Sequence, residues 1–342
     1  MDYTVVIPTY NRPKMLAEAI TSIAQQQGQG AISVEIVIID DSSSPPVDIE
    51  DLHKLFAGHI QLHRNDSPCG LAYNRDKGVQ LASADIVIHL DDDDMLAPDA
   101  LARITQFFAE HPDHGSTFLG VKGFGKSKKH FEQVQNLGLS KAMARCKFTQ
   151  TGSTVLFSEP LLPALLKSVP MCFQRIAVKK SLWIATNNLR LKAYQKSTSP
   201  EHRDKSMREI TGPLRDTEWA IYHSLLTTPA LLNTPIYHQR CDGQGMVSVA
   251  AMRDKQVYAH IAIKQQLVKA SHHMQVLKSF TQQIKRNMAD TFFNEAYYQL
   301  HTLKDRKKAF TYWVATQKVL GQPAYKKFAL SLCIPHTLLP RK

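Results

Sequence analysis

The sequence predicts an α/β fold, in which a mostly parallel sheet carries helices on both faces and a C-terminal helical region follows. Short apolar, β-branched runs alternate with amphipathic stretches over the first 125 residues, as in successive strand–helix–strand units. The apolar runs are almost continuous, which is typical of parallel strands that are buried on both faces. Beyond residue 250 apolar residues recur every three or four positions, which indicates helices.

Each element of the first half has its own sequence signal. The first strand ends at Pro8 and the helix after it begins near Pro13, because proline is tolerated in a helix's first turn but interrupts a strand. Later strands are β-branched runs bounded by polar or acidic residues. We expect strands over residues 4–7, 34–39, 60–63, 86–90 and 117–123, and helices over residues 13–27, 70–82 and 101–110.

Four consecutive carboxylates, Asp91 to Asp94, follow the strand at 86–90 and precede Pro98. They are expected at the carboxyl edge of the sheet, which is the usual ligand crevice of open α/β folds. Their mutual repulsion would be offset by a hard divalent cation that carries diphosphate oxygens. The alternative is a solvated acidic turn, but the position directly after an apolar strand favours a metal and nucleotide site.

Polar residues also follow the first two strands, at the same expected edge. The loop from Pro8 to Arg12 ends the first strand, and Asp40 and Asp41 end the second. No GxGxxG motif follows the first strand, and no GxxxxGK[ST] motif occurs. A diphosphate would therefore be held by metal and basic side chains, which argues against a dehydrogenase or a P-loop enzyme.

Composition indicates a globular protein with 43% hydrophobic residues. The five cysteines are scattered without a CxxC pair, which favours reduced thiols in a cytoplasm over disulfides or a zinc site. We expect no signal peptide, because Met1 is followed at once by a strand-like run without a basic leader. No uninterrupted apolar stretch reaches the roughly 18 residues that a membrane span requires.

The formal net charge of +12 is concentrated in the tail. Residues 251–342 contain 16 Lys or Arg and 4 Asp or Glu, which leaves 26 of each sign in residues 1–250. A basic tail can bind nucleic acid or an anionic membrane face, and the alternative is a set of solvated Lys-rich helices. Its helices are expected over residues 257–270, 274–289, 292–303 and 306–320, with aromatic and basic residues mixed at 312–313 and 325–328.

The middle of the chain has weaker signals. Residues 126–130 are Lys-rich and are expected to form a mobile loop that clamps diphosphate or acceptor, or is merely solvated. Strands are expected over 154–157 and 173–178, and a surface loop over 197–206.

Four ordered motifs stand out in the first hundred residues: Val5–Arg12, Asp40–Ser42, Gly70–Gly78, and Leu90–Asp94 with Pro98. Together they resemble the motifs of family 2 glycosyltransferases with the GT-A fold. The resemblance is firm over about residues 1–125, thinner to about 250, and absent beyond. Asp76 departs from it, since the family usually has Asn after the Arg.

The resemblance implies an inverting, metal-dependent enzyme that transfers a sugar from a nucleoside diphosphate, with Mn²⁺ or Mg²⁺ as cofactor. A GT-A domain is then expected over 1–250, with a nucleotide-sugar half at 1–125 and an acceptor half at 126–250, followed by the basic helical region 251–342. The implied donor contacts are Pro8, Thr9, Tyr10, Arg12, Asp40, Arg75, Asp91 and Asp92, and Asp93 and Asp91 are the implied metal ligands.

Residues 214–222 are similar to the acidic, aromatic helix start that carries the catalytic base in this family. Asp216 and Glu218 are the candidate catalytic acids of this motif, and Asp216 is the expected base. An Asp in the first turn of a helix is also an ordinary capping choice. His238 lies in a run that is similar to the strand and Gly-rich turn, residues 237–248, that often close such a domain. It is a candidate metal ligand, although a lone His after a strand is more often structural.

The predicted function is transfer of a sugar, with a UDP-sugar as the leading donor, to a hydroxyl of a glycan or lipid-linked acceptor. Bacterial cell-surface polysaccharide or lipopolysaccharide synthesis is the expected setting, in the cytoplasm or peripherally on the inner face of the membrane. The alternative is a catalytically inactive nucleotide-sugar binding or scaffold protein. A nucleic-acid partner is not expected, because the sequence has no RNA-binding signature and no basic strand face.

Overall fold

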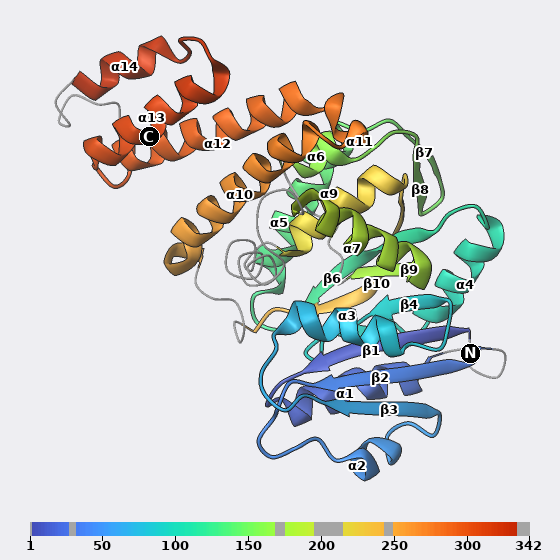
Figure 1. Ribbon diagram of the computed structural model, residues 1–342. Coiled ribbons are helices and arrows are strands. Elements are labelled where there is room, and N and C mark those ends of the chain that lie inside the picture. The colour runs from blue at the N-terminus through green and yellow to red at the C-terminus, as the bar shows by residue number, and fades with distance from the viewer. Residues whose placement is uncertain (1, 27–31, 168–174, 195–214, 243–248, 334–342) are drawn as a thin grey trace. The chain divides into compact units, whose positions relative to one another are not determined.

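A computed structural model describes residues 2–26, 32–167, 175–194, 215–242 and 249–333 of the chain (Figure 1). The chain forms two compact units, which are Met1–Leu189 with Trp219–Met246, and Arg190–Glu218 with Val247–Lys342. The second unit therefore includes Arg190–Glu218, a segment that precedes the boundary suggested by the sequence at residue 250. The expected loop at 197–206 and the Gly-rich turn at 243–248 lie outside the described residues.

The first unit is built on one ten-stranded sheet with the order β3-β2-β1-β4-β9-β6-β10-β8-β7, in which β5 also pairs with β10. Each expected strand that lies within the described residues is present, and β5, β7 and the first part of β10 are additional. The strands are β1 (Tyr3–Thr9), β2 (Val34–Asp40), β3 (His59–Arg64), β4 (Ile86–His89), β5 (Met95–Leu96), β6 (Ser116–Phe124), β7 (Phe148–Thr151), β8 (Thr154–Phe157), β9 (Ile176–Lys179) and β10 (Ala230–Arg240).

Strand direction confirms a mixed, mostly parallel sheet. The pairs β3–β2, β2–β1, β1–β4 and β6–β10 are parallel. β9 lies between β4 and β6 and is antiparallel to both, so β4 and β6 still point the same way. The carboxyl ends of β1, β2 and β4 therefore meet at one edge, as the sequence predicted.

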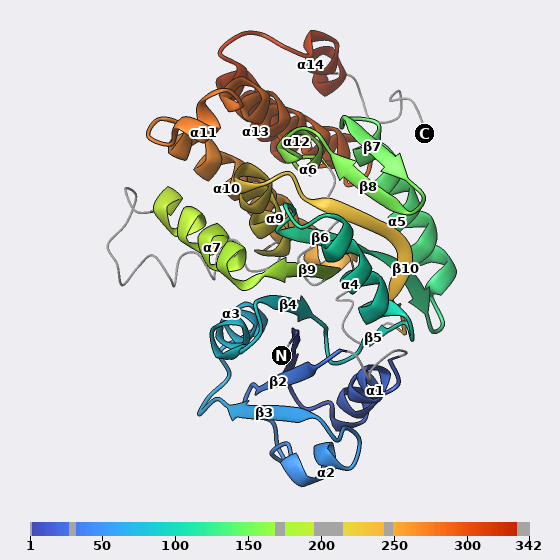
Figure 2. The ribbon, with the colours of Figure 1, turned by 90° about the vertical axis from the view of Figure 1, so that its right-hand side faces the viewer.

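Helices cover both faces of the sheet, as Figure 2 shows for α1 (Pro13–Ala24) and α3 (Leu71–Leu81). α1 and α4 (Ala100–Glu110) contribute to the core that includes Val5 and Ile7 of β1. α3 packs on the opposite face, where a Cβ at Gly78 would lie 2.3 Å from Val6 Cγ1. Glycine at this position therefore permits the close approach of α3 to β1.

The expected mobile loop at 126–130 was wrong for most of its length, because α5 (Lys128–Met143) begins within it. The turn before α5 is held from a distant part of the chain, since the backbone N–H of Ser127 donates to Cys241 O at 2.9 Å. The composition of residues 126–130 cannot indicate a contact with a residue so far away in the sequence. Further helices are α2 (Ile49–His53), α6 (Leu162–Leu165), α7 (Lys180–Tyr194) and α9 (Arg215–Leu226), and the end of α7 and the start of α9 belong to the second unit.

The second unit confirms the helical pattern of the tail. Two of the expected helices are one continuous helix, α12, because no Gly or Pro interrupts residues 281–301. Within the described residues no helix is both long and apolar enough to cross a membrane. The tail helices are α10 (Val249–Ser271), α11 (Gln275–Lys278), α12 (Thr281–His301), α13 (Arg306–Leu320) and α14 (Lys326–Cys333).

Candidate functional site

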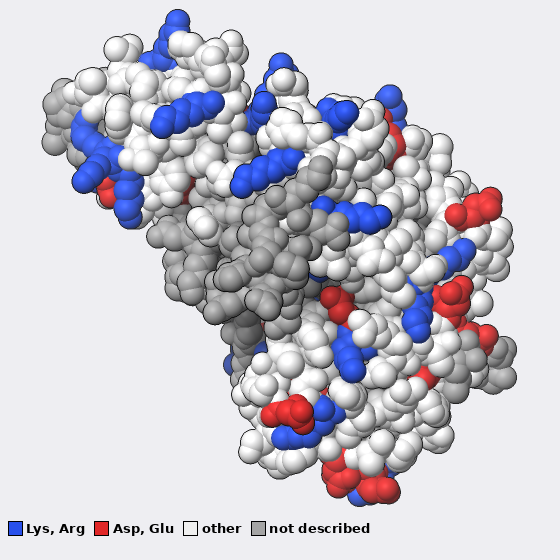
Figure 3. Space-filling model, in the orientation of Figure 1, with Lys and Arg blue, Asp and Glu red and all other residues white. Residues whose placement is uncertain are grey.

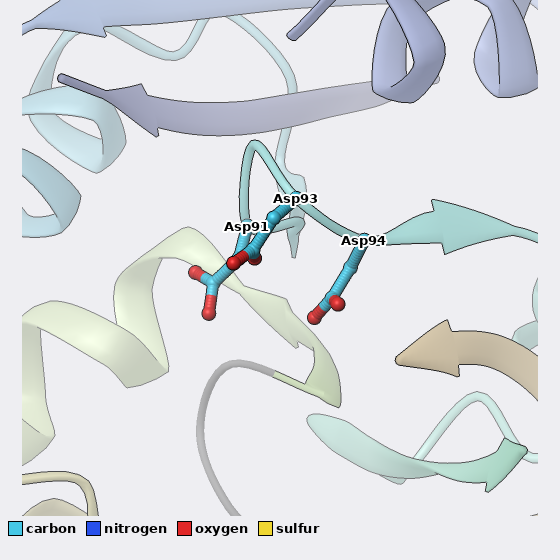
Figure 4. Close-up of side chains that lie close together, drawn as sticks. All are labelled: Asp91, Asp93 and Asp94. Atoms are coloured by element: carbon cyan, nitrogen blue, oxygen red, sulfur yellow. The ribbon is translucent and has the colours of Figure 1, made fainter. Parts of the chain in front are cut away.

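The acidic run forms a tight loop between β4 and β5. The backbone N–H of Asp94 donates to Asp91 O at 3.0 Å, which closes the turn. Asp91, Asp93 and Asp94 each offer a carboxylate oxygen within 4.8 Å of the others, and Figure 4 shows the three side chains projecting from this one loop. Three hard oxygen ligands at such spacing can hold a divalent cation.

Strand β10 contacts this loop through Tyr237 and Arg240. The buried Tyr237 hydroxyl donates to Asp94 Oδ2 at 2.8 Å and accepts from the Asp91 backbone N–H at 3.3 Å. The Arg240 backbone N–H donates to Asp94 Oδ1 at 2.8 Å, and its Nε donates to Asp93 O at 2.9 Å. These contacts span more than 140 residues of sequence, and no motif indicated them.

Asp92 points to the other side of the loop, toward the end of β1. It accepts hydrogen bonds from Thr9 Oγ1 at 2.8 Å and from Arg12 Nη1 at 3.1 Å. The same Arg12 Nη1 donates to Asp93 Oδ2 at 3.0 Å. Arg12 thus joins the acidic cluster to the loop after β1, as the shared sheet edge predicted.

Burial, with a further contribution from neighbouring carboxylates, raises the pKa values of Asp92, Asp93 and Asp94. Burial raises the pKa of Asp92 to about 6, against the opposing effects of the Thr9 hydrogen bond and Arg12. Burial, and then the neighbouring Asp91, raise the pKa of Asp93. Burial, followed by Asp91 and Asp93, raises the pKa of Asp94 well above its ordinary value. The charged forms of these carboxyls are therefore unfavourable in the loop, and a bound cation would stabilise them.

A cavity of about 220 Å³ opens beside Asp92. It is bounded by the loop after β1, by the start of α3 and by polar side chains from three strand ends. Tyr10 is half-exposed at this site. The lining residues are Pro8, Thr9, Tyr10, Arg12, Asp41, Leu71, Asn74 and Asp92.

Asp41, which sequence reasoning did not select, lines this cavity in place of Asp40. Asp40 is buried and turned away, accepting from Arg64 Nη1 at 2.7 Å and from the Ser43 backbone N–H at 2.8 Å. Asp41 accepts from the backbone N–H groups of Cys69 and Gly70 at 2.7 and 2.9 Å. Alternation along β2 could have separated the two acids, since neighbouring side chains point to opposite sides.

Arg75 is buried and forms an ion pair with Asp91. Arg75, which the sequence predicted to bind the nucleotide-sugar donor, thus lies directly beside the acidic cluster. Its neighbour Asp76 accepts hydrogen bonds from Trp183 Nε1 at 3.1 Å and from Asn187 Nδ2 at 2.8 Å. The departure from the family motif at Asp76 therefore serves to attach α3 to α7.

His238 is not among the grouped ligands, and Asp94 stands beside Asp91 and Asp93 instead. The reason is the register of β10. Tyr237 points to the acidic loop, so the next side chain along the strand, His238, projects to the opposite face. Burial and the nearby Lys122 lower the pKa of His238.

Asp216 and Glu218 belong to the second unit, in the first turn of α9. Asp216 is half-buried, and its Oδ1 accepts from the Thr217 backbone N–H at 3.0 Å. Glu218 is fully buried, accepts from the Tyr194 hydroxyl and lies 3.7 Å from Arg190 Nη1. Buried pairing of this kind is typical of a structural carboxylate.

Comparison with known proteins adds independent findings. Residues 4–158 match the family model for glycosyl transferase family 2. The chain is 29% identical over 115 residues to the glucosyl-dolichyl phosphate glucuronosyltransferase of Haloferax volcanii. The aligned stretch covers 33% of this chain and 36% of that protein. The matched stretch spans only about a third of the first curated relatives.

Solved structures are similar over most of the chain. Staphylococcus aureus TarS in complex with UDP-GlcNAc is 16% identical with a TM-score of 0.56, covering 93% of this chain and 81% of that one. The mannosyltransferase PcManGT of Pyrobaculum calidifontis, in complex with GDP-Man and Mn²⁺, is 15% identical with a TM-score of 0.51, covering 96% and 77%. These likenesses show the fold. Residues 4–158 therefore carry the match to glycosyl transferase family 2, and the sheet that they help to form has the GT-A fold of these solved structures.

Proposed function

We propose that the chain is a metal-dependent, inverting glycosyltransferase that transfers a sugar from a nucleoside diphosphate to a hydroxyl of a glycan acceptor. The observation that carries this proposal is the joining of the cavity to the acidic cluster through Arg12, which donates to Asp92 and Asp93. A nucleoside and its diphosphate require such a hollow next to a site of charge neutralisation.

The carboxylates of Asp91, Asp93 and Asp94 suit a divalent cation such as Mn²⁺ or Mg²⁺. They supply hard oxygen ligands, and burial together with the neighbouring carboxylates raises the pKa values of Asp93 and Asp94, which favours binding of a counter-charge at this loop. A cation bound there supplies charge neutralisation for the departing diphosphate. Arg12 and Arg75, which pair with the same acids, keep the loop in place.

Asp216 is the proposed general base. It accepts the proton of the acceptor hydroxyl as that oxygen forms a bond to the anomeric carbon, and the bond from that carbon to the diphosphate oxygen breaks. The nucleoside diphosphate leaves with the bonding electrons. Because attack and departure occur on opposite faces, the anomeric configuration inverts.

The donor and acceptor proposals rest on relatives. TarS binds UDP-GlcNAc, which favours a UDP-sugar, and the Haloferax volcanii relative is named for a dolichyl phosphate acceptor, which favours a lipid-linked one. The deciding experiment is to measure nucleotide release from a panel of UDP, GDP and dTDP sugars with MnCl₂ or MgCl₂. Metal-dependent release from one nucleotide class supports the proposal, whereas binding without release favours the inactive scaffold.

Cation binding should be coupled to proton release. Burial raises the pKa of Asp92 to about 6, so Asp92 retains a proton near that pH, and the pKa values of Asp93 and Asp94 are also raised above that of an ordinary Asp. A cation favours their charged forms, so its affinity should rise with pH between about 5 and 7. Calorimetric titration of MnCl₂ in two buffers of different ionisation enthalpy counts the protons; an affinity independent of pH would contradict this coupling.

We further propose that the basic tail holds the enzyme at an anionic, cytoplasmic membrane face. Lys307, Lys308, Lys326 and Lys327 are exposed on α13 and α14, and each basic residue near such a surface contributes on the order of 1 kcal/mol. We expect co-sedimentation with anionic liposomes and release by about 0.5 M salt.

Changing these four lysines to Glu should weaken liposome binding and leave donor hydrolysis unchanged. Donor hydrolysis serves as the control for correct folding, because the nucleotide cavity is formed by the first unit and the four lysines lie in the second. Protein that stays in solution with anionic liposomes at low salt would refute the membrane proposal.

A further inference from the structure

The C-terminal pair of helices carries a preformed apolar groove. A hollow of about 550 Å³ lies between the end of α13, the turn that follows it and α14. Its apolar lining includes Trp313, Pro323, Ala324 and Ala329, and Lys318 and Lys326 stand beside them. The groove lies entirely within the second unit.

Several contacts fix the shape of this groove. α13 ends at Gly321 in the left-handed conformation, and the backbone N–H of Ala324 then donates to Gln317 Oε1 at 2.5 Å. Tyr325 stacks on Phe293 of α12 at 3.7 Å between ring centroids and donates to Asp290 Oδ1 at 2.8 Å. Since the turn is attached to α12 in this way, the groove does not depend on a ligand to form.

Exposed apolar side chains extend the groove along both helices. Phe310 is 53% exposed, and its ring lies 5.9 Å from that of Trp313. Leu330 is 68% exposed and lies one turn beyond Lys326 on α14. On α13 the buried positions are Ala309 and Thr316, so Phe310 is not part of the face that packs on α12. Large apolar side chains exposed next to an apolar groove mark an interaction surface.

The charge around the groove identifies the partner. Residues 303–333 contain seven Lys or Arg and a single acid, Asp305, and within the described chain Lys307, Lys308, Lys318, Lys326 and Lys327 form no ion pair. Figure 3 shows blue side chains, with little red, over the region where Figure 1 draws α12 to α14. A second copy of this surface would place lysines against lysines, which disfavours self-association.

We infer that this groove docks on anionic phospholipid, with acyl chains contacting the groove, Phe310 and Leu330 while the flanking lysines contact the headgroup phosphates. The inference deepens the proposed membrane contact, on which it rests, by adding apolar insertion to surface charge. An amphipathic surface of this composition lies in the plane of the interface and inserts only its apolar side.

Trp313 provides a direct test, because the other two tryptophans, Trp183 and Trp219, are buried in the first unit. Vesicles of phosphatidylglycerol brominated on the acyl chains should quench the fluorescence of the full chain. Trp313→Phe should keep vesicle binding and lose the quenching. Unquenched fluorescence of vesicle-bound wild type would overturn the inference while leaving the charge-based membrane proposal intact.

A double variant of the groove and a control variant elsewhere test apolar insertion while the charge of the chain stays constant. Leu330→Ser, combined with Phe310→Ser, should lower affinity for phosphatidylglycerol vesicles by about tenfold, because exposed side chains lose their apolar contact with lipid. Leu137→Ser on α5, which changes a leucine of 56% exposure in the first unit, should have no effect. Equal affinity of the double variant and wild type would overturn the inference.

Two further measurements keep the outcomes distinct. Nucleotide release, assayed in the same preparations, reports on the enzymatic proposal independently of vesicle binding. Light scattering reports on association, and a dimer that is lost on Leu330→Ser would assign the groove to a second copy of the chain and overturn the lipid inference.

Discussion

Asp93→Asn should abolish sugar transfer and lower donor affinity. The substitution removes one ligand charge from the cluster of Asp91, Asp93 and Asp94, at the place where diphosphate charge must be balanced. Chelation with EDTA should reproduce the loss, and added MnCl₂ should reverse it in the wild type but not in the variant. The measurement is nucleotide release together with donor affinity by calorimetry.

Thermal unfolding distinguishes this loss from misfolding. The pKa of Asp93 is raised, so its charged form is unfavourable in the folded protein near neutral pH, and the neutral Asn should leave the melting temperature unchanged or higher. Asp99→Asn is the control, since Asp99 is a partly exposed acid at the start of α4 that pairs with Arg103. Full turnover of wild type in chelator would show that the metal assignment is wrong.

Asp216→Asn should reduce the turnover number by roughly a hundredfold to ten-thousandfold, which is the usual contribution of a general base. Donor affinity should stay near normal, because the change removes a proton acceptor and leaves the charge of the acidic loop unaltered. The variant should also lose the dependence of turnover on deprotonation of that carboxyl. Single-turnover kinetics separate this chemical step from donor binding.

Glu218→Gln is the matched control, two residues along the same helix. The buried Glu218 accepts from Tyr194 and lies near Arg190, and removing one partner of a buried pair costs on the order of 3–5 kcal/mol. We therefore expect a lower melting temperature with a retained turnover number per folded molecule. If Glu218→Gln were inactive while folded and Asp216→Asn active, the base would be Glu218.

The sequence by itself determined the sheet and the edge that carries the site. Strand and helix patterns depend on the local spacing of apolar residues, and they located β1, β2, β3, β4 and β6 to within a few residues. Since parallel strands end at a common edge, the same patterns predicted that the loop with Thr9 and Arg12 lies beside the acidic run, and both side chains donate to Asp92. These features need only short-range periodicity and one topological rule.

Only the tertiary structure decided which neighbouring side chain faces the site. Asp41 instead of Asp40 lines the cavity because Arg64, on the adjacent strand, binds Asp40. Asp94 instead of His238 joins the acidic cluster because the register of β10 directs Tyr237 toward it. A shift of one residue in a strand reverses the side that each side chain faces, and the contacts that set the register join residues far apart in the chain.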